Sequence, residues 1–301
     1  MATVTTIGLD IAKSVFQVHG IDEGGVVVVR RRLMRAKVLS FFEQLPPCLV
    51  GIEACGTAHH WGRELRKLGH DVRLMPPFYV KAYLKRQKND AADAEAICEA
   101  VTRPSMRFVA IKSPEQQGVM SIHRVRLMLM RQRTQLSNAI RGHLGELGIV
   151  APIGRVGLAR LITLVSDPSG GGLPDDLRAS VMMLAVQLSL VNEQLLELDR
   201  KVRASAKATE VGKRLMEIPG VGPVLASALV ATIPDPKVFK SGRNLAAWIG
   251  LVPRQNSSGG KERLGGITKG GDRYLRQDAG DRCARGHSVR TAARHQAPLA
   301  G

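Results

Sequence analysis

Four acidic residues in the first third of the sequence are placed where they could bind divalent metal ions together. Two end apolar segments and two begin a predicted helix; they are Asp10, Glu53, Asp90 and Asp93. Asp90 and Asp93 are three residues apart, so they share a helix face and repel each other by roughly a few tenths of a kcal/mol unless a cation lies between them. Carboxylates from two strand ends and one helix predict a site for a pair of hard cations, Mg²⁺ (or Mn²⁺). Two such ions about 4 Å apart activate the attacking oxygen and stabilise the leaving oxygen in phosphodiester chemistry.

The segments around these acids predict an α/β layer. Strands are expected at residues 4–10, 15–20, 25–31, 49–53 and 71–75, and short helices at 36–44 and 59–68. Three hairpin-like strands, followed by strands that alternate with helices, describe a ribonuclease-H-like layer in which the first strand is central and its terminal acid faces the site. Residues 107–111 are expected to form a last strand or the exit from this domain.

A basic strip directly precedes the two aspartates of the predicted helix. It consists of Lys81, Lys85, Arg86 and Lys88. Such a strip can be a solvated helix face. Beside a carboxylate cluster, a contact with nucleic-acid phosphates is the better interpretation.

The whole chain is strongly basic. Its 301 residues include 44 Lys and Arg against 26 Asp and Glu, a formal net charge of +18. This balance favours a polyanionic partner, above all nucleic acid. Aromatic residues make up only 4%, so a base-stacking platform is not expected to dominate.

Composition also predicts the compartment. No apolar run reaches the roughly 18 residues of a membrane helix, and the first residues do not resemble a signal peptide. The four cysteines form no C-x-x-C pair, as expected in a reducing compartment. We expect a cytoplasmic protein without a membrane partner.

Two long helices are predicted in the middle of the chain. Ser113 and Pro114 are a good helix start, and the pattern continues to about residue 146. Residues 151–177 are broken by Pro and Gly, and a second helix then extends to about residue 202. Its apolar residues alternate three and four apart as a heptad seam: Val181, Leu184, Leu188, Val191, Leu195, Leu198 and Val202. The first helix has a less strict apolar face: Ile122, Val125, Leu129, Leu136 and Ile140. We expect an antiparallel coiled-coil hairpin that could also dimerise; a plain helical bundle is the alternative.

A glycine turn between two short helices follows. Residues 215–226 predict a helix-hairpin-helix. Its glycines, Gly220 and Gly222, would let the backbone approach a phosphate, and the second helix would offer its free N–H groups. An ordinary helical hairpin is the alternative. Another short helix is expected at 239–249.

Residues 250–272 combine glycine, hydroxyl and basic side chains. As composition, this is a flexible surface loop. As chemistry, it offers a serine nucleophile, backbone donors, and Lys261, Arg263 and Lys269 to neutralise a phosphate. Composition alone does not choose between the two.

The order of motifs from residue 4 to 276 resembles the DEDD-class transposases of the insertion sequence one-ten family, most closely its eleven-eleven subgroup. The motifs that carry the resemblance are Gly8-Leu9-Asp10-Ile11-Ala12-Lys13, Lys88-Asn89-Asp90-Ala91-Ala92-Asp93-Ala94, Ile218-Pro219-Gly220-Val221-Gly222, Gly250-Leu251-Val252-Pro253-Arg254 and Lys269-Gly270-Gly271-Asp272. The resemblance implies a RuvC-like N-terminal domain whose acidic quartet is Asp10, Glu53, Asp90 and Asp93. It also implies a serine nucleophile in the C-terminal transposase domain, Ser258, with Ser257 as second candidate.

The resemblance further implies how such a protein acts. Members of the family form a phosphoserine link to DNA, work as oligomers (dimer or tetramer) on a circular intermediate, and are guided by a structured non-coding bridge RNA. Such a protein would be prokaryotic, cytoplasmic and nucleoid-associated. If base pairing with the RNA reads the sequence, the protein need only grip backbones, which would account for the low aromatic content and high charge.

Other functions fit parts of the same sequence. A metal nuclease would need the acidic quartet but not Ser258, and a nucleic-acid-binding protein with a decayed site would need neither. A sugar-kinase-like ATPase also begins with an apolar strand ending in Gly-x-Asp, but the high positive charge and the helix-hairpin-helix argue against it.

The sequence divides into four parts: a RuvC-like domain at 1–112, a coiled-coil linker at 113–207, a transposase domain at 208–276 and a basic tail at 277–301. The resemblance implies an apolar helix after residue 276, where this chain is polar and basic. That difference predicts a frameshifted or truncated copy with impaired activity.

Overall fold

The structure is a computed structural model that describes residues 3–85, 89–167 and 172–276. The chain forms two compact units, Met1–Ser113 with Ile233–Asp235, and Pro114–Thr232 with Pro236–Gly301. Arg86 and Lys88 of the basic strip and the tail at 277–301 lie outside the described residues.

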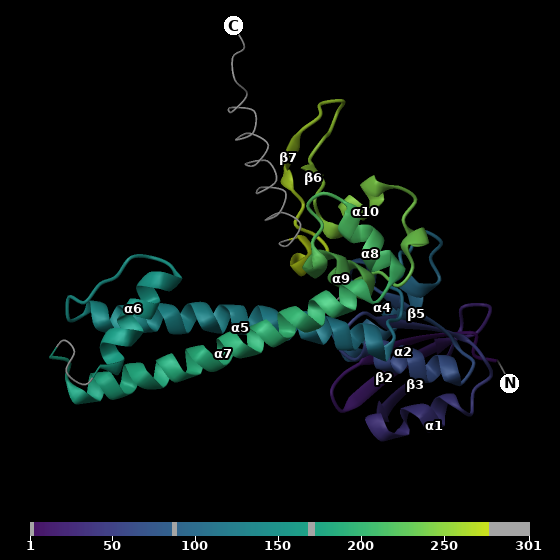
Figure 1. Ribbon diagram of the computed structural model, residues 1–301. Coiled ribbons are helices and arrows are strands. Elements are labelled where there is room, and N and C mark those ends of the chain that lie inside the picture. Colours follow the sequence, from purple (N-terminus) through teal and green to yellow (C-terminus); the bar gives the residue numbers. More distant parts are fainter. Residues whose placement is uncertain (1–2, 86–88, 168–171, 277–301) are drawn as a thin grey trace, which may run out of the picture. The chain divides into compact units, whose positions relative to one another are not determined.

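The first unit is built on a five-stranded sheet (Figure 1). Its strands are β1 (Thr6–Ile11), β2 (Val15–Ile21), β3 (Val27–Met34), β4 (Leu49–Glu53) and β5 (Asp71–Met75). Their order is β3-β2-β1-β4-β5, with β1, β4 and β5 parallel and β2 antiparallel to its neighbours. The first strand is therefore central, and the predicted α/β layer is confirmed.

Helices cover both faces of this sheet. They are α1 (Val38–Phe42), α2 (Ala58–Lys67), α3 (Pro77–Val80) and α4 (Asp90–Val101), with short 3-10 turns at Arg35–Lys37 and Lys81–Tyr83. Ile7 and Leu9 of β1 are buried in one core with residues of α1 and α2. The expected last strand at 107–111 forms only a single bridge, between Val109 and Leu74.

On the opposite face of the sheet, α4 packs against two glycines. Gly8 of β1 lies directly beside Gly51 of β4. A Cβ atom on Gly8 would overlap the carbonyl oxygen of Ala94, and one on Gly51 would lie 2.8 Å from Cβ of Val101. Only a surface without side chains lets the helix lie this close to the strands.

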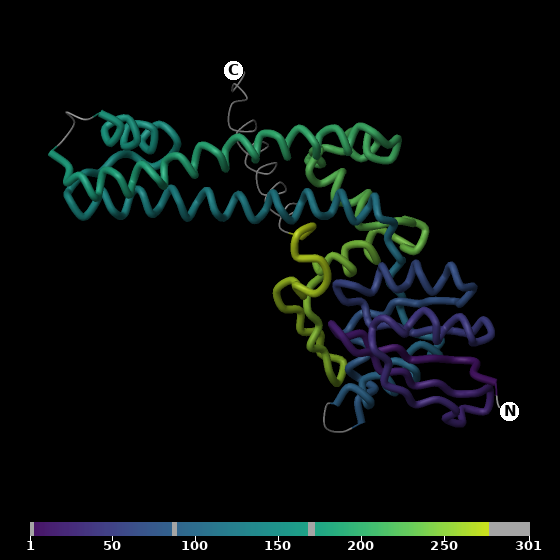
Figure 2. Tube along the Cα trace, turned by 90° about the horizontal axis from the view of Figure 1, so that it is seen from below, coloured from purple at the N-terminus to yellow at the C-terminus, as the bar shows by residue number. Residues whose placement is uncertain are grey.

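The second unit begins with two long antiparallel helices (Figures 1 and 2). They are α5 (Pro114–Gly145) and α7 (Asp175–Lys207). The seam predicted on α7 is buried or half-buried throughout. On α5 the expectation fails at Val125, which is 39% exposed; His123 is buried instead.

A further helix, α6 (Arg155–Ser166), lies within the stretch expected to be broken. Its buried residues Leu161 and Val165 join the core between α5 and α7. Proline and glycine before and after this segment concealed its helical apolar period, so the prediction for residues 155–166 was wrong.

The remaining elements of this unit are short. They are α8 (Glu210–Glu217), α9 (Pro223–Thr232), a 3-10 turn at Pro236–Val238, α10 (Gly242–Ile249), β6 (Pro253–Gln255) and β7 (Leu264–Ile267). Two short helices, α8 and α9, are joined by a turn in the segment where a helix-hairpin-helix was expected, and α10 ends at residue 249 as expected. The assignment of α8 and α9 as a helix-hairpin-helix remains a prediction. The stretch at 250–272 is a β-hairpin rather than a structureless loop.

Among the described residues, α7 alone is long and apolar enough to cross a membrane by length and composition. One such helix is weak evidence for a membrane span. Its heptad seam is packed in a core shared with α5 and α6.

Candidate active site

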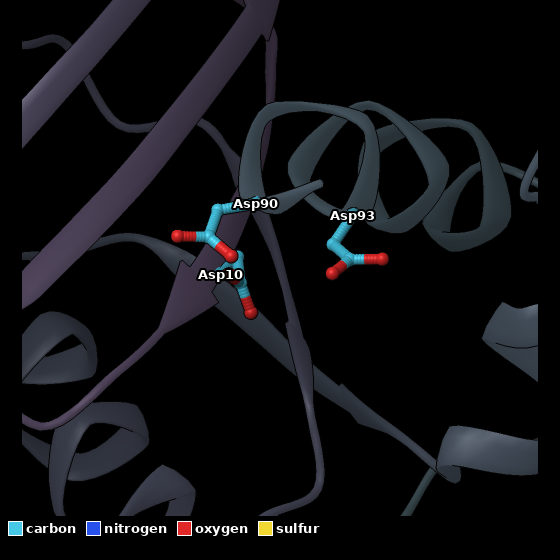
Figure 3. Close-up of side chains that lie close together, drawn as sticks. All are labelled: Asp10, Asp90 and Asp93. Atoms are coloured by element: carbon cyan, nitrogen blue, oxygen red, sulfur yellow. The ribbon is translucent and has the colours of Figure 1, made fainter. Parts of the chain in front are cut away.

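Three of the four predicted acids come together in the first unit (Figure 3). Asp10 lies at the end of β1, and Asp90 and Asp93 lie in the first turn of α4. One carboxylate oxygen from each of the three lies within 4.8 Å of the others. Asn89 fixes this turn because its side chain accepts a 2.8 Å hydrogen bond from the N–H of Ala92.

The electrostatics of Asp10 show how closely the acids are packed. Burial raises the pKa of this carboxyl from 3.8 to about 6, with further contributions from the charges of Asp93, Asp90 and Glu53. A carboxylate costs free energy in such surroundings unless a cation compensates it. The donor set consists of oxygens only, which suits a hard divalent cation.

Glu53 lies apart from this group. It ends β4 and follows Ile52, which is the register partner of Leu9. Its carboxylate is not among the ligand atoms that lie within 4.8 Å of one another. It acts on Asp10 as a nearby negative charge, and its role as a fourth ligand remains a prediction.

The basic strip has two described members. Lys81 is exposed in the 3-10 turn after α3. Lys85 forms ion pairs with Glu95 at 3.5 Å and Glu99 at 3.4 Å. Part of the charge of Lys85 is therefore already compensated, and Lys81 is the described residue that is better placed to meet a phosphate.

In the second unit, glycines close the base of the β6–β7 hairpin. Gly250 ends α10 in the left-handed conformation, with φ of 87°. A Cβ atom there would overlap the carbonyl oxygen of Gly270, and one on Gly271 would overlap that of Trp248. The N–H of Lys269 donates to the carbonyl of Gly250 at 3.2 Å. The glycine motifs at both ends of the hairpin are thus backbone contacts that fix its base.

The tip of this hairpin carries the two candidate serines. The N–H of Lys261 donates to the carbonyl of Ser258 at 3.1 Å, across Gly259 and Gly260, whose φ angles are 56° and 75°. Positive φ at both central residues defines a primed turn, which fits the twist of a hairpin.

The two hydroxyls differ in their surroundings. Ser257 Oγ accepts a 3.1 Å hydrogen bond from the N–H of Arg263. Ser258 Oγ is exposed and makes no hydrogen bond with the residues that the structure describes. Lys261, Arg263 and Lys269 are exposed on the same hairpin. Ser258 Oγ is thus the less constrained of the two hydroxyls, and its role as nucleophile remains a prediction.

The turn between α8 and α9 has the geometry expected from its glycines. Gly220 has φ of 89° and is exposed, with open space around it. Gly222 is half-buried at the start of α9. The backbone at this turn is accessible to a phosphate, and nucleic-acid binding by the turn remains a prediction.

The second unit contains a buried hydrogen-bond network that the sequence did not predict. His123 Nδ1 lies 2.8 Å from the hydroxyl of Tyr274, and its Nε2 lies 3.1 Å from Oγ of Ser227, which donates to Ser205. Burial lowers the pKa of His123 to about 4, with a smaller contribution from Arg126. The imidazole is therefore neutral and links the segment after the serine hairpin to α5. A lone histidine among apolar residues gave no signal of this partnership.

Comparison with known proteins identifies the family. Residues 7–149 match a family model described as Transposase, of the DEDD type of IS110, and residues 212–278 match the Transposase IS116/IS110/IS902 family. The chain is 51% identical over 274 residues to a probable family 20 transposase of Pseudomonas aeruginosa, covering 91% of this chain and 81% of that protein. It is 41% identical over 276 residues to the transposase for insertion sequence element IS1111A of Coxiella burnetii, covering 92% and 76%.

A third relative agrees. The transposase for insertion sequence element IS1328 of Yersinia enterocolitica is 39% identical over 277 residues, covering 92% of this chain and 82% of that protein. The DEDD family implies dependence on a divalent metal, and the cluster of Asp10, Asp90 and Asp93 provides oxygen ligands for it. The chain therefore belongs to the IS110/IS116 family of insertion-sequence transposases, enzymes that cleave and join DNA.

Proposed function

We propose that this transposase excises and inserts an insertion sequence by cutting and rejoining DNA, with Ser258 as nucleophile and a divalent metal ion bound by the acidic residues of the first unit. The observation that carries the proposal is the convergence of Asp10, Asp90 and Asp93 within 4.8 Å. Three carboxylates held this close favour binding of a cation and then of a phosphodiester.

Asp10, Asp90 and Asp93 would hold the metal, with Glu53 as a fourth ligand. Mg²⁺ (or Mn²⁺), when bound, neutralises charge on the phosphodiester and activates an oxygen nucleophile. The protein positions the ligands through the strand end of β1 and the capped first turn of α4.

Ser258 supplies the covalent step. Its Oγ attacks the phosphorus of a DNA phosphodiester, a bond forms between Oγ and phosphorus, and the bond from phosphorus to one sugar oxygen breaks. The proton of the serine hydroxyl passes to a base, and the leaving oxygen takes up a proton to become a free hydroxyl end. Attack by a hydroxyl of another strand reverses these steps, restores Ser258 and joins the strands.

The basic hairpin supports binding of the DNA at this step. Lys261, Arg263 and Lys269 are exposed on the same hairpin as Ser258 and can neutralise the attacked phosphate. The glycine turn between α8 and α9 and the exposed Lys81 would contact other phosphates of the nucleic-acid backbone.

The proposed function also includes an RNA partner, an oligomeric state and a cellular location. A structured bridge RNA pairs with donor and target DNA, which agrees with 4% aromatic residues and a net charge of +18. The protein acts as a homo-oligomer, a dimer or tetramer. It works in the prokaryotic cytoplasm, at the nucleoid, where its DNA substrate lies.

A denaturing-gel assay for a covalent protein–DNA adduct tests the proposal. Purified full chain is incubated with Mg²⁺, the ends of the element and the RNA encoded beside the gene. Wild type and Ser257→Ala are expected to form the adduct, whereas Ser258→Ala and Asp10→Asn are expected to lose it. Ser257→Ala is the matched control because it also removes a serine hydroxyl, one residue before Ser258.

Other outcomes point to other functions. Cleavage without an adduct would show a metal nuclease that only hydrolyses DNA. An adduct that persists in Ser258→Ala and disappears in Ser257→Ala would move the nucleophile by one residue. Binding without cleavage or adduct would show a nucleic-acid-binding protein with a decayed site.

A further inference from the structure

A groove lies between β2, β3 and the start of α4. Its volume is about 340 Å³, comparable with sites that hold one small ligand, so it can take a short piece of a single strand rather than a duplex. Its lining includes Gln17 and His19 of β2, Arg30 and Arg32 of β3, and Asn89 and Ala92 at the start of α4.

The strand register connects this groove to the aspartate cluster. Asp10 of β1 lies opposite Gln17 of β2, and Gln17 lies opposite Arg32 of β3. Residues that lie opposite one another across a sheet project from the same face. Arg32 is therefore on the same face as Asp10, two strand spacings away, or about 10 Å along the row.

Arg30 belongs to the next row on the same face. It lies opposite His19, which lies opposite Gly8, the glycine on which α4 rests. The two arginines are two residues apart on β3, so both side chains project toward the α4 side of the sheet. The two arginines therefore lie on β3, on the same face of the sheet as Asp10.

The charges of these arginines are compensated unequally. Arg30 forms a 3.6 Å ion pair with Glu95, which also pairs with Lys85. Arg32 is exposed and makes no ion pair with any residue that the structure describes. An exposed guanidinium without a carboxylate partner is available for bidentate hydrogen bonding to an anion.

We propose that this groove binds the sugar-phosphate backbone of a nucleic-acid strand that extends to the aspartates, with Arg32 on a phosphate beside the one that is cut. The inference rests on the proposed function, because it places the strand relative to the metal centre. The row from Asp10 to Arg32 is only about 10 Å long. Arg32 thus contacts a phosphate close to the one that is cut.

The proposal is tested by binding in EDTA, so that no cleavage is needed. The probes are fluorescent single strands of DNA and of RNA with the sequence of an element end, and the proteins are full-length wild type and Arg32→Gln. Removing one phosphate contact lowers the slope of log affinity against log salt by about 0.7 and weakens binding about fivefold at 0.1 M salt. The polymer that shows this loss identifies the strand in the groove.

Two further variants separate the contact from general charge. Arg107→Gln removes an exposed arginine of the same unit outside the groove lining, so its slope is expected to stay within about 0.2 of wild type. Arg32→Lys keeps the charge and is expected to recover most of the slope. Thermal unfolding of each variant confirms that the unit remains folded.

A neutral methylphosphonate moved one position at a time along the strand locates the contact. At the position bound by Arg32 it weakens wild type about fivefold and adds no further loss to Arg32→Gln, because the same interaction is removed twice. The inference is overturned if Arg32→Gln keeps the wild-type slope on both polymers, as it would if the groove binds an acidic protein. It is also overturned if the methylphosphonate effects add at every position.

Since these measurements do not involve cutting, they stand apart from the adduct assay. A missing adduct together with a localised Arg32 contact would refute the serine chemistry and keep the groove. An adduct together with an unchanged slope would do the reverse.

Discussion

Binding of the metal should release a proton from Asp10 near pH 6. The pKa of this carboxyl is raised to about 6 by burial and by the charges of Asp93, Asp90 and Glu53. A cation can bind only the ionised form, so it displaces the proton. The expected release is about 0.5 proton at pH 6 and about 0.1 at pH 7.

The affinity for the metal follows from the same fractions. It should rise with pH, because protonation competes with the cation. Relative to pH 8, binding is expected to be about twofold weaker at pH 6 and about tenfold weaker at pH 5. Without metal, the favourable contribution of the protonated Asp10 to stability is complete below about pH 4 and is lost as pH rises through about 6.

Calorimetric titration with Mn²⁺ in two buffers of different ionisation enthalpy counts the released protons. Glu53→Gln removes one of the charges that raise the pKa of Asp10, so the release at pH 6 should fall below that of wild type. Glu23→Gln, an exposed position in the turn before β3, is the matched control and should keep the wild-type release. A release at pH 6 no larger than that at pH 8 would refute the reasoning.

Three other predictions concern the packing that holds the sites. Gly8→Ala places a Cβ atom against the backbone of α4 and should destabilise the first unit by about 3 kcal/mol; a loss in chemical unfolding below about 0.5 kcal/mol would contradict this packing. Leu188→Ala, at a buried seam position, should cost the second unit about 2–5 kcal/mol, whereas the exposed Met183→Ala should cost less than about 0.5 kcal/mol. Tyr274→Phe removes the hydroxyl that is the hydrogen-bond partner of the buried Nδ1 of His123 and should cost about 1–3 kcal/mol; an unchanged unfolding curve would show that the contact does not form.

Several sequence predictions depend on local rules, and these held. The order of strands and helices in the first unit follows from apolar runs, turns and helix starts. Asn89 was part of the motif that begins α4, and the structure gives it the capping role that its residue type favours. The heptad on α7 specified its buried face without reference to any other part of the chain.

The failures involve partners that lie far away in sequence. Val125 fits the apolar period of α5 but is exposed, while His123 is buried because Tyr274 and Ser227 satisfy its ring nitrogens. The composition of residues 250–272 fitted both a flexible loop and a site of phosphate chemistry, and it did not reveal that Gly250 and Gly271 make the close backbone contacts that allow a hairpin to close. Amino-acid composition suggests how flexible a segment is, but it does not reveal which backbone segments lie against one another in the folded protein.

The sequence by itself determined the chemistry that this protein can perform and the elements that carry it. It placed Asp10 at a strand end, Asp90 and Asp93 on one helix turn, and two serines among basic residues, because residue type and local spacing fix these features. Tertiary structure decided which groups meet. It brought three acids within 4.8 Å and left Glu53 outside that group, and it aligned Arg32 with Asp10 through two strand registers. Those distances depend on how strands pair and how a helix packs on glycines, which no local pattern specifies.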